Sequence, residues 1–231
     1  MLKFIRQRLF RASSLDGRNA LQAWAESSGW TMRNSRDRDG FIIETRAGVL
    51  EGRVEWGPSQ RHYMGSHELR LRGEVPALSG EAHALVMPRL LLDSVEAELF
   101  SQFVGGVQTR IDEETPEEMR WLAVSPKLSG ALLGELKAHY AAVSNRVPWL
   151  AHWLHGPLGE ALLQRALGPA EAAPPFALIV HRNRLTLRVA LPDPDVATVQ
   201  AAQNLFELAL EQARVTADEP AADEDEGPPS Q

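Results

Sequence analysis

Alternation of apolar and polar residues with a period of two marks the chain between about residues 41–87 and 176–191. Side chains that alternate in this way lie on opposite faces of a β-strand. The first region contains "FIIETR", "VLEGRVEW", "HELRLRGEV" and "AHALVMP", and the second contains "FALIVHRNRLTLRVAL". Because several strands follow one another without an intervening helix, antiparallel pairing is expected. The sequence therefore predicts an α+β fold, with antiparallel sheet in these two regions and helices packed on one face.

Helical periodicity and capping residues predict the remaining elements. Helices are expected over residues 16–29 and 88–103, and from Ser125-Pro126, Pro148, and Asp193 or Asp195. The segments "VQTRI" and "MRWLAV" are read as short strands on either side of the acidic loop "DEETPEE". The turn of the last hairpin is placed at Arg182-Asn183, where the alternation changes direction.

Charge alternation suggests how the second and third strands of the first region pair. We predict that Glu55 lies opposite Arg72 and Arg53 opposite Glu74, on a solvated face of the sheet. A slip by two residues would set Arg53 against Arg72 and would keep the apolar face buried.

The two ends of the chain differ from its centre in composition. Residues 1–14 form a basic, amphipathic segment that begins as a short helix, and residues 215–231 form an acidic, proline-rich tail that we expect to be disordered. Residues 15–214 are expected to form the α+β domain. A break at Gly105-Gly106 could divide this domain into two subdomains, 15–104 and 105–214.

Composition excludes several classes of protein. The 231 residues include no cysteine, so thiolate metal sites and cysteine nucleophiles are absent. The net charge of −7 argues against nucleic acid as a partner. The sequence contains no apolar run long enough to span a membrane and no recognisable secretory signal, so a cytoplasmic location is expected. Arginine outnumbers lysine 21 to 3, which is typical of a GC-rich bacterial genome.

The polar loop after the strand that ends at Trp56 is the first candidate site. Hydrogen-bonding side chains follow one another there, in a set that could hold a phosphate or a carboxylate. The candidate ligand-binding residues are Ser59, Gln60, Arg61, His62 and Tyr63. The alternative is a polar turn that packs on Trp56.

The aromatic pair Trp149 and Trp153 is the second candidate site. Four residues apart on a helix, the two rings lie on one side, and we predict that they pack on a neighbouring helix or bind a partner. His152 and His155, like His62, His67 and His83, lack the remaining ligands of a recognisable metal motif. No metal site and no cofactor are therefore predicted.

The catalytic and nucleotide-binding motifs that carry known chemistry are missing, including GxGxxG, Walker A and GxSxG. The order of elements and the closing segment "RLTLRVALPDPDVATVQAAQNLFELAL" resemble the secretion-chaperone-like α+β fold of small acidic bacterial proteins, in topology alone.

A non-enzymatic protein-binding or adaptor module, acting on another protein, is the leading interpretation. One alternative is a small-ligand-binding protein or hydrolase with an anion-binding loop at 57–67. A second is a peripheral membrane-surface protein that attaches weakly through residues 1–11. The oligomeric state is left open.

Overall fold

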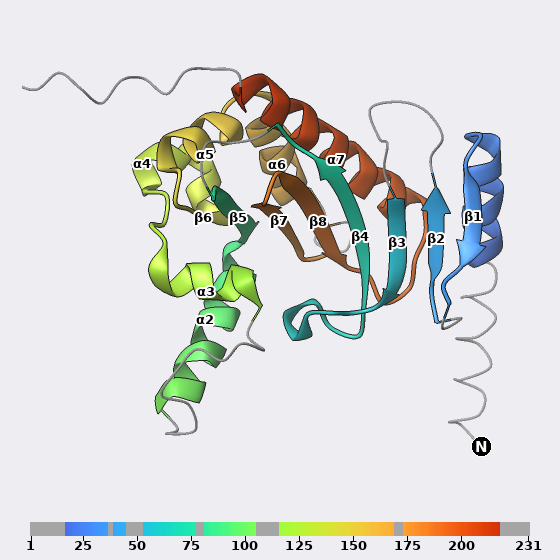
Figure 1. Cartoon of the computed structure of the whole chain (residues 1–231), viewed down its shortest axis with the longest axis horizontal. Coiled ribbons are helices and arrows are strands. Elements are labelled where there is room, and N and C mark those ends of the chain that lie inside the picture. The colour runs from blue at the N-terminus through green and yellow to red at the C-terminus, as the bar shows by residue number, and fades with distance from the viewer. Residues whose placement is uncertain are drawn as a thin grey trace, which may run out of the picture.

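The computed structural model describes residues 17–36, 39–44, 53–76, 81–104, 116–168 and 173–217. Eight strands lie within them. They are β1 (Thr31–Asn34), β2 (Phe41–Glu44), β3 (Arg53–Pro58), β4 (His67–Glu74), β5 (His83–Pro88), β6 (Tyr140–Ser144), β7 (Phe176–His181) and β8 (Arg184–Ala190). They form one sheet in the order β1-β2-β3-β4-β8-β7-β5-β6, and every neighbouring pair is antiparallel (Figure 1). The predicted α+β class with antiparallel sheet is confirmed.

The helices surround this sheet. Residues 17–27 are helical, as the sequence predicts. The longer helices are α2 (Arg89–Val104), α3 (Glu117–Val124), α5 (Val147–Leu154), α6 (Pro157–Leu167) and α7 (Val196–Ala217). Shorter turns are η1 (His62–Met64), α4 (Gly130–Leu133) and η2 (Gly134–Ala138). No helix among the described residues combines the length and the apolar character needed to cross a membrane.

The β7–β8 hairpin occupies the centre of the sheet, between β4 and β5. Its turn lies at Arg182-Asn183, as predicted, and both residues have positive φ angles, of 50° and 59°. Two consecutive residues with positive φ give the tight turn whose twist matches that of the flanking strands. The hairpin therefore joins residues from the two halves of the chain into one continuous sheet.

Helices α5, α6 and α7 and the helix at 17–27 cover one face of the sheet and build the main core with it (Figure 1). Leu69 and Leu71 of β4 and Phe206 and Leu210 of α7 are all buried there. Trp153 of α5 is completely buried and donates a hydrogen bond from Nε1 to the Ala209 carbonyl, 2.9 Å away. This face is apolar because every second residue of the strands points into it.

Helices α2 and α3 pack on the opposite face and cover only the β5–β7 end of the sheet. Leu85 and Met87 of β5 are buried there against Leu92 and Val95 of α2, and Met64 joins them from η1. Helices thus lie on both faces of the sheet, where the sequence predicts them on one. The apolar residues on the second face of β5 explain the difference, because a strand that is apolar on both faces must be covered on both.

Several predicted elements between α2 and α5 are wrong. The segment "MRWLAV" is part of helix α3 and not a strand, because its Met119, Trp121 and Leu122 pack into the second cluster. Ser125 ends α3 and does not start a helix, whereas Ser129 caps α4 by accepting a hydrogen bond from the Leu132 amide. Residues that were expected to continue a helix form the buried strand β6.

Strands β3 and β4 are adjacent and antiparallel as predicted, but their register differs by two residues. Arg53 lies opposite Arg72, and Glu55 lies opposite Arg70. The connection sets this register, since the Ser59 amide donates to the Ser66 carbonyl at 2.9 Å and η1 fills the turn. A slip by two leaves the apolar face unchanged, so the prediction depended on the charged pairs alone, and these favoured the wrong register.

Helix α7 continues through Ala217, so residues 215–217 belong to it and the predicted start of the tail is three residues too early. Thr216 is buried in this last turn. Residues 1–14, the strand predicted for "VQTRI" and residues 218–231 lie outside the described residues.

Close packing of α7 on β4 yields a first prediction. A Cβ atom added at Gly73 would lie 3.1 Å from Leu210 Cδ2 and 3.2 Å from Phe206 Cζ, both in the buried core. We expect Gly73→Ala to lower the free energy of unfolding by about 1–3 kcal/mol, measured by chemical denaturation. Gly57→Ala in β3 is the matched control, because its nearest atom would lie 3.4 Å away. Equal stability of the two variants would contradict the packing argument.

Candidate functional site

The sheet face opposite α7 carries a group of arginine side chains over strands β1 to β4 and β8, and we call it the arginine face. Residues that lie directly opposite each other in antiparallel strands point to the same side, so strand pairing aligns these charges. Its members are Arg33, Ile42, Glu44, Arg53, Glu55, Glu68, Arg70, Arg72, Glu74, Arg184, Thr186 and Arg188.

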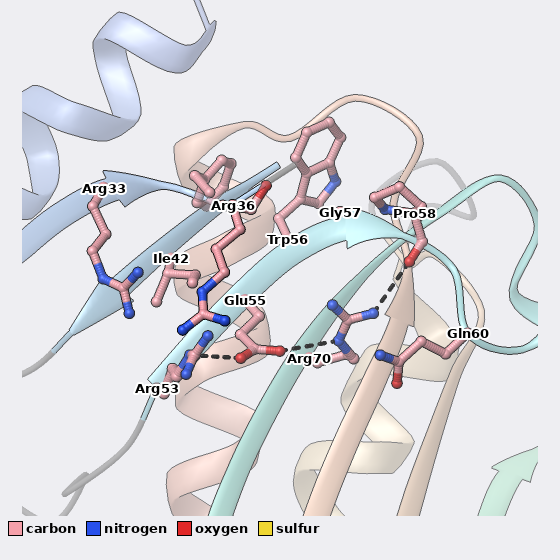
Figure 2. A pocket seen from close by; sticks show the side chains of 12 residues that line it. Arg33, Arg36, Ile42, Arg53, Glu55, Trp56, Gly57, Pro58, Gln60 and Arg70 are labelled. Carbon is pink, nitrogen blue, oxygen red and sulfur yellow. Dashed lines mark hydrogen bonds and ion pairs between the residues drawn. The ribbon is translucent and has the colours of Figure 1, made fainter. Parts of the chain in front are cut away.

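A cavity of about 460 Å³ lies at the β1–β3 end of the arginine face. Among the described residues, four arginines line it, Arg33, Arg36, Arg53 and Arg70, together with one carboxylate, that of Glu55. Figure 2 shows Arg33, Arg36 and Arg53 on one side of Glu55 and Arg70 on the other. The cavity therefore has more positive than negative groups.

The Glu55 carboxylate is shared among three arginines. It forms an ion pair with Arg53, and its Oε2 atom lies 3.4 Å from Arg70 Nε and 3.3 Å from Arg72 Nη1. The predicted attraction between Glu55 and Arg72 is thus present, but it runs diagonally across the two strands. The face is not fully solvated as predicted, since only 13% of the Glu55 side chain is exposed.

A completely buried carboxylate, that of Glu68, holds the centre of the face. Its Oε1 atom lies 2.9 Å from Arg70 Nη1 and 2.7 Å from Arg188 Nη1, and it accepts the backbone amide of Gln60 at 3.0 Å. Arg70 and Arg188 face each other across β4 and β8, and both are buried. Without Glu68 these two positive charges would face each other in a poorly hydrated site, which is costly.

A second cavity, of about 360 Å³, lies beyond Glu68, between the sheet and α3. Four arginines line it as well, namely Arg61, Arg182, Arg184 and Arg188. Glu117 of α3 neutralises part of this charge, because its carboxylate lies 2.9 Å from His181 Nδ1 and 3.6 Å from Arg182 Nη2. Trp121 of α3 and Thr186 of β8 also line it.

The structure directs the five predicted loop residues towards neighbouring elements. Ser59 and Gln60 hold the turn, through a hydrogen bond from Ser59 Oγ to the Arg61 carbonyl at 2.7 Å and through the contact of Gln60 with Glu68. His62 lies 3.2 Å from Glu98 of α2. Arg61 and Tyr63 both bind Glu118 of α3. The loop thus binds both α2 and α3, which cover the second face of the sheet. It also places Arg61 at the second cavity.

The Glu118 carboxylate is buried and accepts three hydrogen bonds from two side chains of this loop. Arg61 donates from Nε and from Nη2, the latter at 3.2 Å, and the Tyr63 hydroxyl donates at 2.7 Å. Burial alone would raise the pKa of Glu118, but the hydrogen bond and charge of Arg61, aided by Tyr63, outweigh it and hold this pKa below its usual value. Burial, together with the charge of Glu118, raises the pKa of Tyr63.

The predicted partner-binding tryptophans lie in the main core. Their rings stack at a centroid distance of 5.3 Å, and Trp149 is partly buried beside the completely buried Trp153. The two rings thus pack helix α5 into the protein, and the arginine face contains neither. Within the described part of the chain, histidines and acidic residues form no cluster of three that could hold a metal ion.

The chain matches no protein-family model, and neither a curated protein nor a solved structure shows significant similarity to it.

Sequence reasoning missed Arg70, Arg184 and Arg188 as site residues. The signal was present in "HELRLRGE" and "RNRLTLR", where Arg70 and Arg72, and likewise Arg184 and Arg188, lie an even number of residues apart and so share one face of a strand. What the sequence does not reveal is that β4 and β8 are neighbours. Their pairing turns two separate rows of charge into one surface.

Removal of the central carboxylate should destabilise the protein strongly. We expect Glu68→Gln to lower the free energy of unfolding by about 3–5 kcal/mol, because it leaves Arg70 and Arg188 buried without their counter-charge. Arg33→Gln is the control: its ion pair with Glu44 is exposed, so its loss should cost no more than about 1 kcal/mol. Denaturant titrations of both variants measure the difference, and a small effect of Glu68→Gln would contradict the assigned role.

The lowered pKa of Glu118 predicts how stability depends on pH. A carboxyl group with a depressed pKa in the folded state stabilises the fold above its unfolded pKa, about 4.3, and this contribution is lost as the pH falls through the folded pKa. Glu118→Gln should therefore be less stable than the wild type at neutral pH and should approach it below about pH 4. Thermal unfolding at several pH values tests this, with Glu160→Gln on the exposed side of α6 as control. A constant difference across the range would refute the prediction.

Proposed function

We propose that this protein is a non-enzymatic binding module of the cytoplasm whose arginine face docks an acidic segment of a partner protein. The observation that carries the proposal is the excess of positive charge on one hollowed sheet face of a chain whose net charge is −7. Complementary charge on a partner would be attracted to this face and repelled by the rest of the surface.

The charge balance of the face supports this proposal. Together, the arginine face and its two cavities contain nine arginines and six glutamates among the described residues. The arginines are Arg33, Arg36, Arg53, Arg61, Arg70, Arg72, Arg182, Arg184 and Arg188, and the glutamates are Glu44, Glu55, Glu68, Glu74, Glu117 and Glu118. An occupant with several carboxylates would offset this excess through charge-assisted hydrogen bonds.

The shape of the face favours a polypeptide over a single small ligand. Arg70 lines the first cavity and Arg188 the second, and both side chains bind Glu68. The cavities therefore lie on either side of this carboxylate along the sheet, and an occupant that reaches both must be extended. Nucleic acid would also be extended, but the acidic remainder of the chain opposes it. An enzymatic role lacks a supporting feature, because among the described residues five of the six glutamates, all but Glu74, form ion pairs with arginines.

The alternative of an anion-binding loop at 57–67 depends on Arg61, whose side chain already binds a glutamate of the protein. Arg61 donates to Glu118, so an anion at the loop would have to compete with a buried carboxylate. Attachment to a membrane surface through residues 1–11 stays a prediction, since that segment lies outside the described residues.

A labelled peptide provides the test. We expect a short fluorescent peptide that alternates glutamate and serine to bind the full chain, in fluorescence anisotropy, and to bind more weakly as salt is added. Arg36→Glu, at an exposed arginine of the first cavity, should weaken this binding about tenfold, or roughly 1.4 kcal/mol.

Arg214→Glu on α7 is the matched control, since it changes the net charge equally at an exposed site away from this face. It should leave the affinity within about twofold of the wild type. The same affinity for a lysine–serine peptide, or equal losses in the two variants, would contradict the proposal.

A further inference from the structure

Thr186 lies at the centre of a concentration of arginines on β4 and β8. It is paired with Arg72, while Arg184 and Arg188 flank it two residues away on the same face of β8. Arg70, opposite Arg188, extends the group. Side chains at these positions of an antiparallel pair are close enough for one small ligand to contact several of them.

The nearby carboxylates bind only some of the guanidinium and hydroxyl donors in this group. Glu55 and Glu68 are shared among Arg53, Arg70, Arg72 and Arg188. Arg184 is exposed and forms no ion pair with any other described residue, and the Thr186 hydroxyl likewise forms no hydrogen bond within the described part of the chain.

One of the unused donors is buried. Arg188 is only 6% exposed, and its Nε atom has no hydrogen-bond partner among the described residues, although the side chain lines the second cavity. A buried donor without a partner is rare, because no hydrogen bond offsets the free energy that its removal from water costs. Such a donor beside a cavity marks a position where a ligand atom could accept a hydrogen bond.

The local electrostatics agree with this geometry. Burial lowers the pKa of Arg72, and the positive charges of Arg70, Arg188 and Arg184 lower it further, although Glu55 acts in the opposite direction. Three further guanidinium groups are thus close enough to Arg72 to act on its charge.

We propose that Arg72, Arg184, Thr186 and Arg188 bind the phosphoryl group of a phosphate monoester. A phosphoryl group carries nearly two negative charges and three acceptor oxygens, which match several guanidinium donors and one hydroxyl. A carboxylate has one charge and two oxygens, so it would use fewer of these donors.

If a protein supplies the phosphoryl group, the acidic segment that docks on the arginine face carries a phosphorylated side chain. The identity of this partner rests on the proposed function. The binding group itself is independent of that partner, because free phosphate has the same chemistry. The experiment therefore includes both sources.

Isothermal titration calorimetry of the full chain with inorganic phosphate is the first measurement. Arg184→Gln removes an exposed side chain, so the fold should persist, and we expect it to weaken phosphate binding about tenfold. Thr186→Val keeps the shape of the side chain but removes the hydroxyl, and it should weaken binding several-fold. Arg214→Gln on α7 is the control and should leave the affinity unchanged. Circular dichroism and chemical denaturation confirm that each variant is folded.

Three peptides of one sequence, with phosphoserine, glutamate or serine at the central position, identify the source. Tighter binding of the phosphoserine peptide than of phosphate or the glutamate peptide, lost in Arg184→Gln, would support the inference with a protein as the source. Binding of this peptide should weaken as the pH falls through about 6, where the monoester loses its second charge. Phosphate binding that depends on Arg184 while none of the peptides binds would support the site and identify free phosphate as the source.

The inference would be overturned if phosphate and the phosphoserine peptide fail to bind, or if they bind wild type and Arg184→Gln equally. If the glutamate–serine peptide still binds, only the phosphoryl site is refuted and the proposed function stands. If this peptide also fails to bind, both proposals are refuted. The two proposals can thus fail separately.

Discussion

The Glu68 carboxylate is the interaction on which the charged half of the structure depends. It lies between Arg70 and Arg188, which face each other on neighbouring strands, and it also fixes the loop through the Gln60 amide. Two arginines can stand side by side in the middle of a sheet only because this buried carboxylate offsets their repulsion. The arrangement holds strands from distant parts of the sequence in register. It also leaves the Nε donor of Arg188, beside the second cavity, without a hydrogen-bond partner among the described residues.

The loop between β3 and β4 has a related role. It carries Arg61 and Tyr63 across to Glu118 of α3, and it buries Met64 among the residues of the second cluster. Polar side chains that the sequence presents as a ligand-binding set are thus used to fasten one part of the protein to another. Burial of the Glu118 carboxylate has a small free-energy cost only when Arg61 and Tyr63 are both placed to donate to it. This requirement favours a single position for the loop.

The sequence predicts the parts of this fold that local periodicity determines. Strands β2 to β5, the β7–β8 hairpin and helices α2 and α7 were predictable because their apolar residues repeat at one clear period. The segment "MRWLAV" misled because six residues with mixed apolar positions fit a short strand and a short helix equally well. The register of β3 and β4 was missed because two alignments bury the same apolar residues, and the loop decided between them. The arginine face required knowledge of which strands are neighbours, and local patterns do not contain it.

The central position of the β7–β8 hairpin has a consequence for synthesis on the ribosome. Strands β4 and β5 follow each other in the sequence, yet the hairpin separates them in the sheet, and residues 89–175 must be translated before its first residue emerges. At ~5–20 residues per second, this delay is roughly 4–17 s, during which both strands present an unpaired edge to the cell. Charged residues on a waiting edge discourage pairing with other chains. Glu68, Arg70 and Arg72 would therefore protect the nascent chain before they form the arginine face of the finished protein.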